Sequence, residues 1–199
     1  MIIGIEGVSC TGKTTLAAGL SERLGWQPVG CYFHVAVDPS ALGRPIAESE
    51  AEQLTALRAH LQVESQRHEF ARVATSRDGG VILDRTVNTL LAHVRAIGEL
   101  QGLDAYGTAR GLILDAINGG AATVPDLTLL LIGEPAVLAQ RATVRPDLPA
   151  IYYAPTFTEY FNAHFDDPIG PRCVPLDATA KPDEVLDAAL RHIARAREA

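Results

Sequence analysis

A glycine-rich segment close to the N-terminus has the spacing that binds phosphate groups. Gly7 is followed by four residues and then by Gly12, Lys13 and Thr14. Glycines let backbone N–H groups converge on phosphate oxygens, and a helix that follows directs its positive end to the same point. The lysine neutralises the β and γ phosphates, and the threonine hydroxyl is the expected Mg²⁺ ligand. The segment therefore predicts a nucleoside triphosphate site rather than a plain glycine turn before a helix. The predicted contacts are Gly7, Ser9, Cys10, Thr11, Gly12, Lys13, Thr14 and Thr15.

A second group of candidates follows the apolar segment 81–83, where Asp84 and Arg85 stand together. A carboxylate at the end of a buried strand can hold the Mg²⁺ shell together with Thr14. The alternative for Asp84 is to cap the helix that follows. Arg85 is predicted to contact the second substrate, because ligands bind beyond the carboxyl ends of parallel strands; its alternative is a pair with a carboxylate.

Alternating strand and helix patterns predict the elements that position these residues. Helical spacing predicts helices over 14–24, 48–77, 87–100, 104–118, 135–142, 156–165 and 182–197. Short apolar or β-branched runs predict strands over 1–5, 28–37, 81–83, 127–132 and 172–176. This order is typical of one α/β domain, residues 1–199, with a parallel sheet between helices. The arginine- and proline-containing segment from about 141 to 155 is predicted to be an exposed, mobile loop.

Composition excludes several classes of function. The chain has 199 residues, a net charge of −7 and no basic run, so it gives no support for nucleic-acid or anionic-membrane binding. No apolar run is long enough to cross a bilayer, and the N-terminus does not read as a signal peptide. The 3 cysteines show no metal-ligand spacing, and neither do the histidines. A reduced, cytoplasmic protein is expected.

Four stretches resemble the thymidylate kinase and deoxynucleoside kinase group of P-loop kinases in order and spacing. They are IEGVSCTGKTT, VILDRTVNTLLAH, PDLTLLLIGEPAVLAQRA and VPLDATAKPDEV. The resemblance covers nearly the whole chain. It implies a five-stranded parallel sheet of the P-loop nucleoside-triphosphate hydrolase type, with helices on both faces. It also implies ATP with Mg²⁺ as phosphoryl donor, an arginine-bearing lid and a homodimer.

The resemblance also implies roles for individual residues. Arg67 and Arg85 would hold the phosphoryl acceptor, and Arg141 and Arg145 would belong to the lid and face ATP during transfer. Around the adenine, the resemblance places Asp177, Ala178 and Thr179. Independently of the resemblance, Phe33 and Tyr152 are candidates to stack on a ring of the acceptor, with core packing as an equal alternative.

Three positions depart from thymidylate kinases. Ser9 stands in place of an aspartate inside the loop, Val37 in place of an arginine, and Thr86 in place of an aromatic residue. Asp38, before a proline, occupies the place where deoxynucleoside kinases carry a carboxylate. A hydroxyl acceptor benefits from a general base, whereas a phosphate acceptor attacks as an anion. Asp38 is thus a candidate base, and an Asx-turn residue is the alternative.

The sequence therefore predicts an ATP-dependent kinase that transfers the γ-phosphoryl group to a nucleoside, a nucleoside monophosphate or a similar small acceptor. One alternative is a kinase for a non-nucleotide hydroxyl metabolite or antibiotic-like compound. Another is a nucleotide-dependent switch or accessory ATPase that uses water as acceptor. The long helix over 48–77 and the predicted lid favour a kinase, because a simple switch needs neither.

Overall fold

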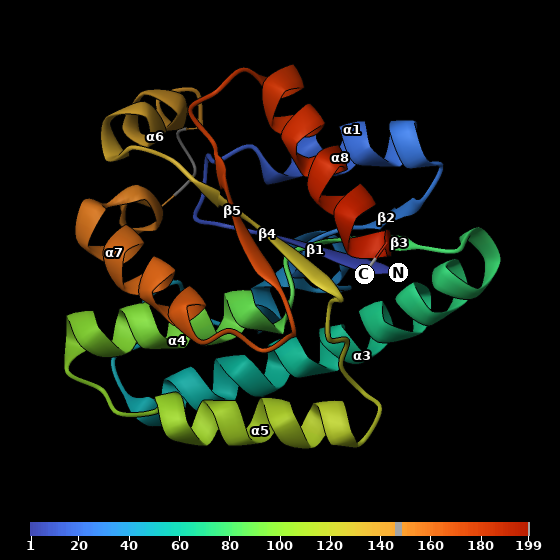
Figure 1. Ribbon diagram of the computed structural model, residues 1–199. Coiled ribbons are helices and arrows are strands. Elements are labelled where there is room, and N and C mark those ends of the chain that lie inside the picture. The colour runs from blue at the N-terminus through green and yellow to red at the C-terminus, as the bar shows by residue number, and fades with distance from the viewer. Residues whose placement is uncertain (146–148, 199) are drawn as a thin grey trace.

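A five-stranded parallel sheet forms the centre of the protein in a computed structural model, which describes residues 1–145 and 149–198 (Figure 1). The strand order is β2–β3–β1–β4–β5, and all neighbouring strands are parallel, which confirms the five-stranded parallel sheet that the resemblance implied. The strands are β1 (Ile2–Glu6), β2 (Gln27–Val29), β3 (Val81–Asp84), β4 (Leu127–Ile132) and β5 (Cys173–Asp177).

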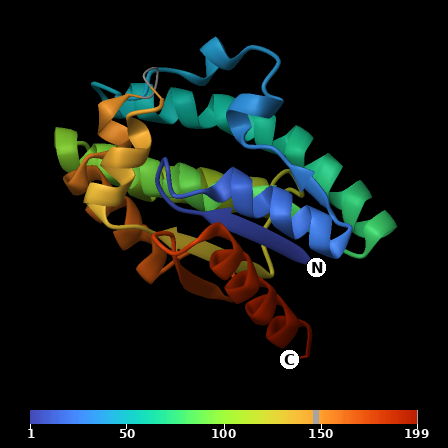
Figure 2. The ribbon, with the colours of Figure 1, turned by 90° about the horizontal axis from the view of Figure 1, so that it is seen from above.

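Helices cover both faces of the sheet. Figure 1 places α1 and α8 on one face, and α3, α4 and α5 on the other, where α7 packs against α4. In Figure 2 the long helix α3 runs along one side of the molecule and α8 lies on the opposite side. The helices are α1 (Lys13–Leu24), α2 (Tyr32–Val35), α3 (Glu50–Asp78), α4 (Val87–Gln101), α5 (Tyr106–Asn118), α6 (Pro135–Ala142), α7 (Pro155–Ala163) and α8 (Pro182–Glu198). Three 3₁₀ turns complete the described elements: η1 (Pro39–Leu42), η2 (Ala150–Tyr153) and η3 (His164–Asp166).

Strand β4 shows how the sequence builds the two cores. Its side chains alternate between the faces of the sheet, as the period of two requires. Leu129 and Leu131 pack toward α1 and α8, whereas Leu130 packs against Phe157 and Phe161 of α7. Because both faces are covered, β4 is an almost continuous apolar run, which is why it was the clearest strand in the sequence.

The sheet brings the candidate residues to one edge. All strands are parallel, so their carboxyl ends meet there, and ligands of open α/β sheets bind beyond that edge. Ile5 of β1 lies beside Asp84 of β3, which brings the start of the glycine-rich loop next to the acidic strand end.

The predicted second strand over 28–37 is wrong beyond Val29. The chain turns after Gly30, and Tyr32 becomes a buried residue of the short helix α2. Burial of this aromatic side chain outweighs the strand propensity of the segment. The predicted loop 141–155 also contains η2, which the sequence did not indicate, and residues 146–148 lie outside the described part.

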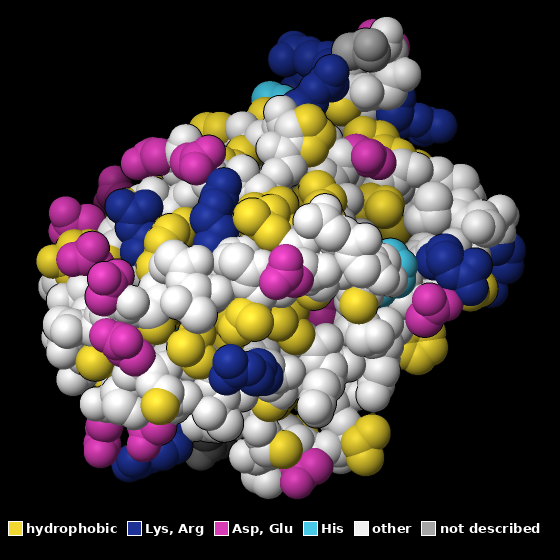
Figure 3. Space-filling model, turned by 90° about the horizontal axis from the view of Figure 1, so that it is seen from below, with side chains coloured by type: hydrophobic (Ala, Val, Ile, Leu, Met, Phe, Trp, Pro, Cys, Tyr) yellow, Lys and Arg dark blue, Asp and Glu magenta, His cyan; other side chains and the backbone are white. Residues whose placement is uncertain are grey.

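Acidic and basic side chains are interspersed over the face shown in Figure 3, which gives no sign of a broad surface of one charge there. No helix among the described residues is long and apolar enough to cross a membrane.

Candidate active site

The glycine-rich loop between β1 and α1 is tightly folded. Gly7 and Gly12 have φ values of 131° and 95°, and Cys10 also adopts a positive φ of 67°. A Cβ atom on Gly7 would lie 2.4 Å from the carbonyl oxygen of Leu131, so only glycine fits there. The left-handed conformation of Cys10 is unfavourable for a residue with a side chain, and such strain is typical of functional loops.

Lys13 lies inside this loop. Its Nζ atom donates to the carbonyl of Val8 at 2.6 Å and to Oγ1 of Thr11 at 3.4 Å. The pKa of Lys13 is lowered to about 7, mainly by burial and to a smaller extent by the charge of Arg85, while Asp84 and Glu6 act in the opposite direction. An ammonium group in such surroundings is stabilised by phosphate, whose negative charge replaces the lost solvation.

The lowered pKa of Lys13 predicts that ATP binding takes up a proton. At pH 8 the amine is mostly neutral in the free protein, and the phosphates favour its charged form. ATP affinity should therefore fall as the pH rises above 7, by at most about 10-fold per pH unit. Calorimetry at pH 8, in buffers of different ionisation enthalpy, should show uptake of nearly one proton. The Lys13→Met variant should show none beyond the background of ATP itself, and equal uptake by both proteins would contradict this prediction.

Thr14 and Asp84, which are both predicted to hold Mg²⁺, lie next to each other. Oγ1 of Thr14 donates to Oδ2 of Asp84 at 2.8 Å, and the other carboxylate oxygen of Asp84 is buried without a partner among the described residues. Helix α4 is capped instead by the side chain of Thr86, so the capping alternative for Asp84 is wrong. No group of three or more His, Cys, Asp or Glu side chains gathers in the described part. One carboxylate and one hydroxyl suit Mg²⁺, which usually completes its shell with water and substrate phosphates.

Glu6 ties β1 to the start of α4. Its buried carboxylate accepts hydrogen bonds from the backbone N–H of Thr86 at 2.8 Å, from the Thr86 hydroxyl at 2.6 Å and from the Thr89 hydroxyl. Burial raises the pKa of Glu6, and these hydrogen bonds offset part of the rise. Thr86, which stands in place of the aromatic residue of thymidylate kinases, thus donates two of the hydrogen bonds to Glu6.

Arg85 occupies a strained position at the end of β3. Its φ is 71°, its backbone N–H donates to the carbonyl of Ile5 at 3.0 Å, and its side chain is half-buried. It takes part in no ion pair within the described ranges. Its charge adds to the effect of burial in lowering the pKa values of Lys13, His60 and His93. The charge of Arg85 therefore acts on side chains of the phosphate loop, α3 and α4.

Arg67 lies in a different environment from the one that the resemblance implied. Its side chain is 1% exposed, and it donates to Glu64 and to the backbone carbonyls of Gly30, Asp84 and Arg85. A direct contact with the acceptor does not fit this geometry, because the guanidinium is enclosed beneath the strand ends. Glu64, its partner, was missed by the sequence analysis. The sequence did contain a signal for this pair, because Glu64 and Arg67 are three residues apart on the apolar side of the predicted helix.

Asp38 forms the Asx turn that was its alternative. It is exposed, and its Oδ1 atom accepts from the backbone N–H of Ser40 at 3.0 Å and from the Ser40 hydroxyl at 2.6 Å. These hydrogen bonds lower the pKa of Asp38.

The two aromatic candidates for stacking lie in different surroundings. Phe33 is 60% exposed, and Tyr152 packs against the rings of His93 and Phe157.

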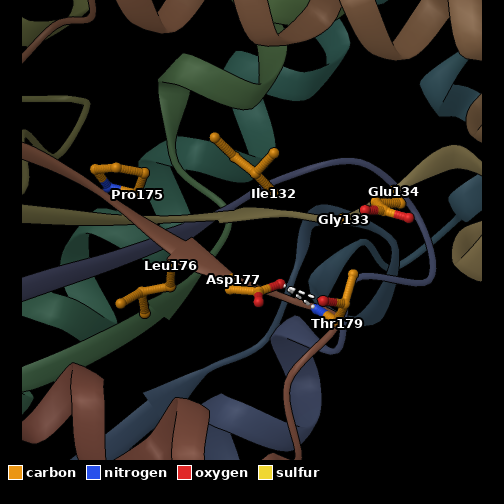
Figure 4. Close-up of a pocket in the computed structure, with 7 residues that line it drawn as sticks. All are labelled: Ile132, Gly133, Glu134, Pro175, Leu176, Asp177 and Thr179. Atoms are coloured by element: carbon orange, nitrogen blue, oxygen red, sulfur yellow. Dashed lines mark hydrogen bonds between the residues drawn. The ribbon is translucent and has the colours of Figure 1, made fainter.

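The predicted adenine-binding segment borders a hollow of about 450 Å³ between the ends of β4 and β5 (Figure 4). Oδ1 of Asp177 accepts from the N–H of Thr179 at 2.8 Å and from its hydroxyl at 2.6 Å, which makes a compact turn at the rim. Arg141 of α6 reaches the loop and donates to the carbonyl of Cys10 at 3.4 Å. Arg145 is exposed, next to the part that is not described. The hollow between the ends of β4 and β5 is lined by Ile132, Gly133, Glu134, Pro175, Leu176, Asp177 and Thr179.

Comparisons with known proteins identify relatives of this chain. Thymidylate kinase from Xanthomonas euvesicatoria pv. vesicatoria is 30% identical over an alignment of 207 positions, which covers 94% of this chain and 80% of that protein. The chain belongs to the thymidylate kinase family. A probable thymidylate kinase from Archaeoglobus fulgidus is 28% identical over 155 residues, covering 74% of this chain and 72% of its own length. No protein-family model matches the chain.

A solved structure confirms the fold. Deoxyadenosine kinase from M. mycoides superposes with a TM-score of 0.72 at 16% identity, covering 98% of this chain and all of that one. The family and the fold together confirm the principal functional prediction. The protein is a P-loop kinase, an ATP-dependent phosphotransferase that acts on a nucleoside, a nucleoside monophosphate or a similar small acceptor.

Proposed function

We propose that the acceptor is a nucleoside monophosphate and that Arg85 binds its phosphate. The observation that carries this proposal is the half-buried Arg85 side chain at the end of β3, next to the Thr14–Asp84 hydrogen bond, which takes part in no ion pair among the described residues. The charge of Arg85 disfavours the charged form of Lys13 in the absence of anions. The phosphates of a donor and an acceptor would relieve this repulsion.

The surroundings of Asp38 also favour a phosphate acceptor. Both its exposure and its hydrogen bonds to Ser40 weaken its candidacy as a base, because they stabilise the carboxylate that would have to take a proton. A phosphate oxygen attacks as an anion and needs no such base. The relatives named thymidylate kinase suggest a pyrimidine nucleotide as the first acceptor to test.

On the donor side, the loop amides and Lys13 would hold the β and γ phosphates of ATP, and Asp177 to Thr179 would border its adenine. Thr14 and Asp84 would hold Mg²⁺, which neutralises charge on the phosphates when it is bound. Arg141, already in contact with the loop, and Arg145 would stabilise the charge that develops during transfer.

A panel of nucleosides, nucleoside monophosphates and hydroxylated metabolites tests the proposal, with acceptor-dependent ADP release as the readout. We expect release with a pyrimidine monophosphate. Arg85→Met should lower kcat/KM for that acceptor by about 100-fold without weakening ATP binding. Asp38→Asn should retain wild-type turnover. A strong response to a nucleoside, lost in Asp38→Asn, would instead assign a hydroxyl acceptor and Asp38 as its base.

Two further features belong to the proposal. A homodimer, expected from the resemblance, is supported by the exposed side chains of Phe70 and Val73, one turn apart on α3. A cytoplasmic location is supported by three free cysteines.

A further inference from the structure

We propose that Arg67 is a positioning residue, which fixes the turn between β3 and α4 and thereby aims the side chains of Asp84 and Arg85. The part that concerns Arg85 rests on the proposed function, whereas the part that concerns Asp84 rests on the kinase activity alone.

The guanidinium of Arg67 joins the ends of two neighbouring strands. Its Nη2 atom donates to the carbonyls of Asp84 and Arg85 at 3.0 and 2.6 Å, and its Nε atom donates to the carbonyl of Gly30 at 3.0 Å. Gly30 follows β2, which pairs with β3. A planar fork with several donors in fixed directions can satisfy three carbonyls at once, which a lysine ammonium on a flexible stem cannot do in the same geometry.

The cation is itself held in place from α3. Nη1 of Arg67 donates to Oε2 of Glu64 at 2.7 Å, and each side chain is 1% exposed. The other oxygen of Glu64 accepts from the backbone N–H of Thr123 at 3.1 Å, and the ring of Tyr32 lies 4.3 Å from the guanidinium carbon. Because both ions have further partners, the pair has a single well-defined arrangement.

The residue held by Arg67 is one that would not adopt its conformation unaided. Arg85 has a φ of 71°, and the left-handed region is unfavourable for any residue with a Cβ atom. Hydrogen bonds to the carbonyls of Asp84 and Arg85 hold the two peptide groups on either side of Arg85 from the Arg67 side. The Arg85 N–H is held by Ile5 from β1. Without the guanidinium, two enclosed carbonyls would lose a donor and Arg85 could relax, which would displace both neighbouring side chains.

The test compares Arg67→Met with Arg72→Met in the full-length protein. Arg72 is a matched control, because it lies on the same helix and pairs with Glu69 at the same spacing, but it is exposed. We expect Arg67→Met to lower kcat/KM for the acceptor by about 100-fold and to raise the Mg²⁺ concentration for half-maximal rate. Binding of ATP without Mg²⁺ should change by less than about 3-fold, since Arg67 makes no hydrogen bond to the phosphate loop among the described residues. Arg72→Met should resemble the wild type throughout.

Different outcomes separate positioning from mere support of the fold. Equal losses in metal-free ATP binding, Mg²⁺ dependence and acceptor use would overturn the proposal, as would wild-type kinetics in a folded Arg67→Met variant. If that variant does not fold, Arg67→Lys keeps a charge beside Glu64 and should show the same selective pattern. Failure of both to fold would make Arg67 a general structural residue and overturn the proposal. The acceptor is whichever compound the panel identifies, so a hydroxyl acceptor would refute the proposed function while leaving this comparison decisive.

Discussion

Replacement of Lys13 by methionine is expected to lower kcat by about 10³-fold, the scale of losing one preorganised charge that stabilises the transition state. The side chain is buried within the loop, where its Nζ atom bonds to Val8 and Thr11. Methionine keeps most of the apolar stem and removes the charge, so the loop should still fold. Steady-state ADP release with saturating acceptor measures the effect, and thermal unfolding checks the fold.

The chain supplies its own control for this variant. Only two of its 17 basic residues are lysines, and the other, Lys181, is exposed at the start of α8. Lys181→Met should retain wild-type kcat. Similar losses in both variants would show that the effect comes from net charge rather than from the position of Lys13.

The second large effect is expected for Asp84→Asn. The amide can still accept the hydrogen bond from Thr14 but removes the negative charge that attracts the metal, so kcat should fall by about 100-fold at physiological Mg²⁺. High Mg²⁺ should restore part of the activity, because the weakened site then fills. A titration of rate against Mg²⁺ concentration measures the shift.

Asp126→Asn is the matched control for Asp84→Asn. Asp126 lies at the opposite edge of the sheet, where its exposed carboxylate accepts from the N–H of Ile2 at 2.7 Å. Its replacement should leave the Mg²⁺ titration unchanged. If Asp84→Asn and Asp126→Asn behave alike, the assignment of Asp84 to the metal is wrong.

The sequence predicted the fold where local patterns and tertiary packing agree. Strand β4 is apolar throughout because both of its faces are buried, and the loop glycines are required by a backbone that no other residue fits. The Thr14–Asp84 contact could also be predicted, because adjacent parallel strands end at the same edge. The parallel order of the strands therefore made it possible to predict both the fold and the proximity of Thr14 and Asp84.

The acceptor side could not be predicted in the same way, because it depends on directions that spacing does not encode. The segment after Val29 has strand-like residues, but burial of Tyr32 turns it into a helix. That turn carries Asp38 into an exposed Asx turn instead of a strand end. The resemblance places Arg67 among the residues that bind the acceptor. In the structure, its side chain is instead buried and forms an ion pair with Glu64.

The mass balance of phosphoryl transfer tests the central claim most directly. Purified protein is mixed with ATP, Mg²⁺ and the best acceptor of the panel, and ADP, inorganic phosphate and phosphorylated acceptor are quantified together. We predict that ADP release is slow without acceptor, rises when acceptor is added, and equals the phosphorylated acceptor formed. ADP release at an unchanged rate, balanced by inorganic phosphate, would contradict the kinase assignment and favour an ATPase or switch.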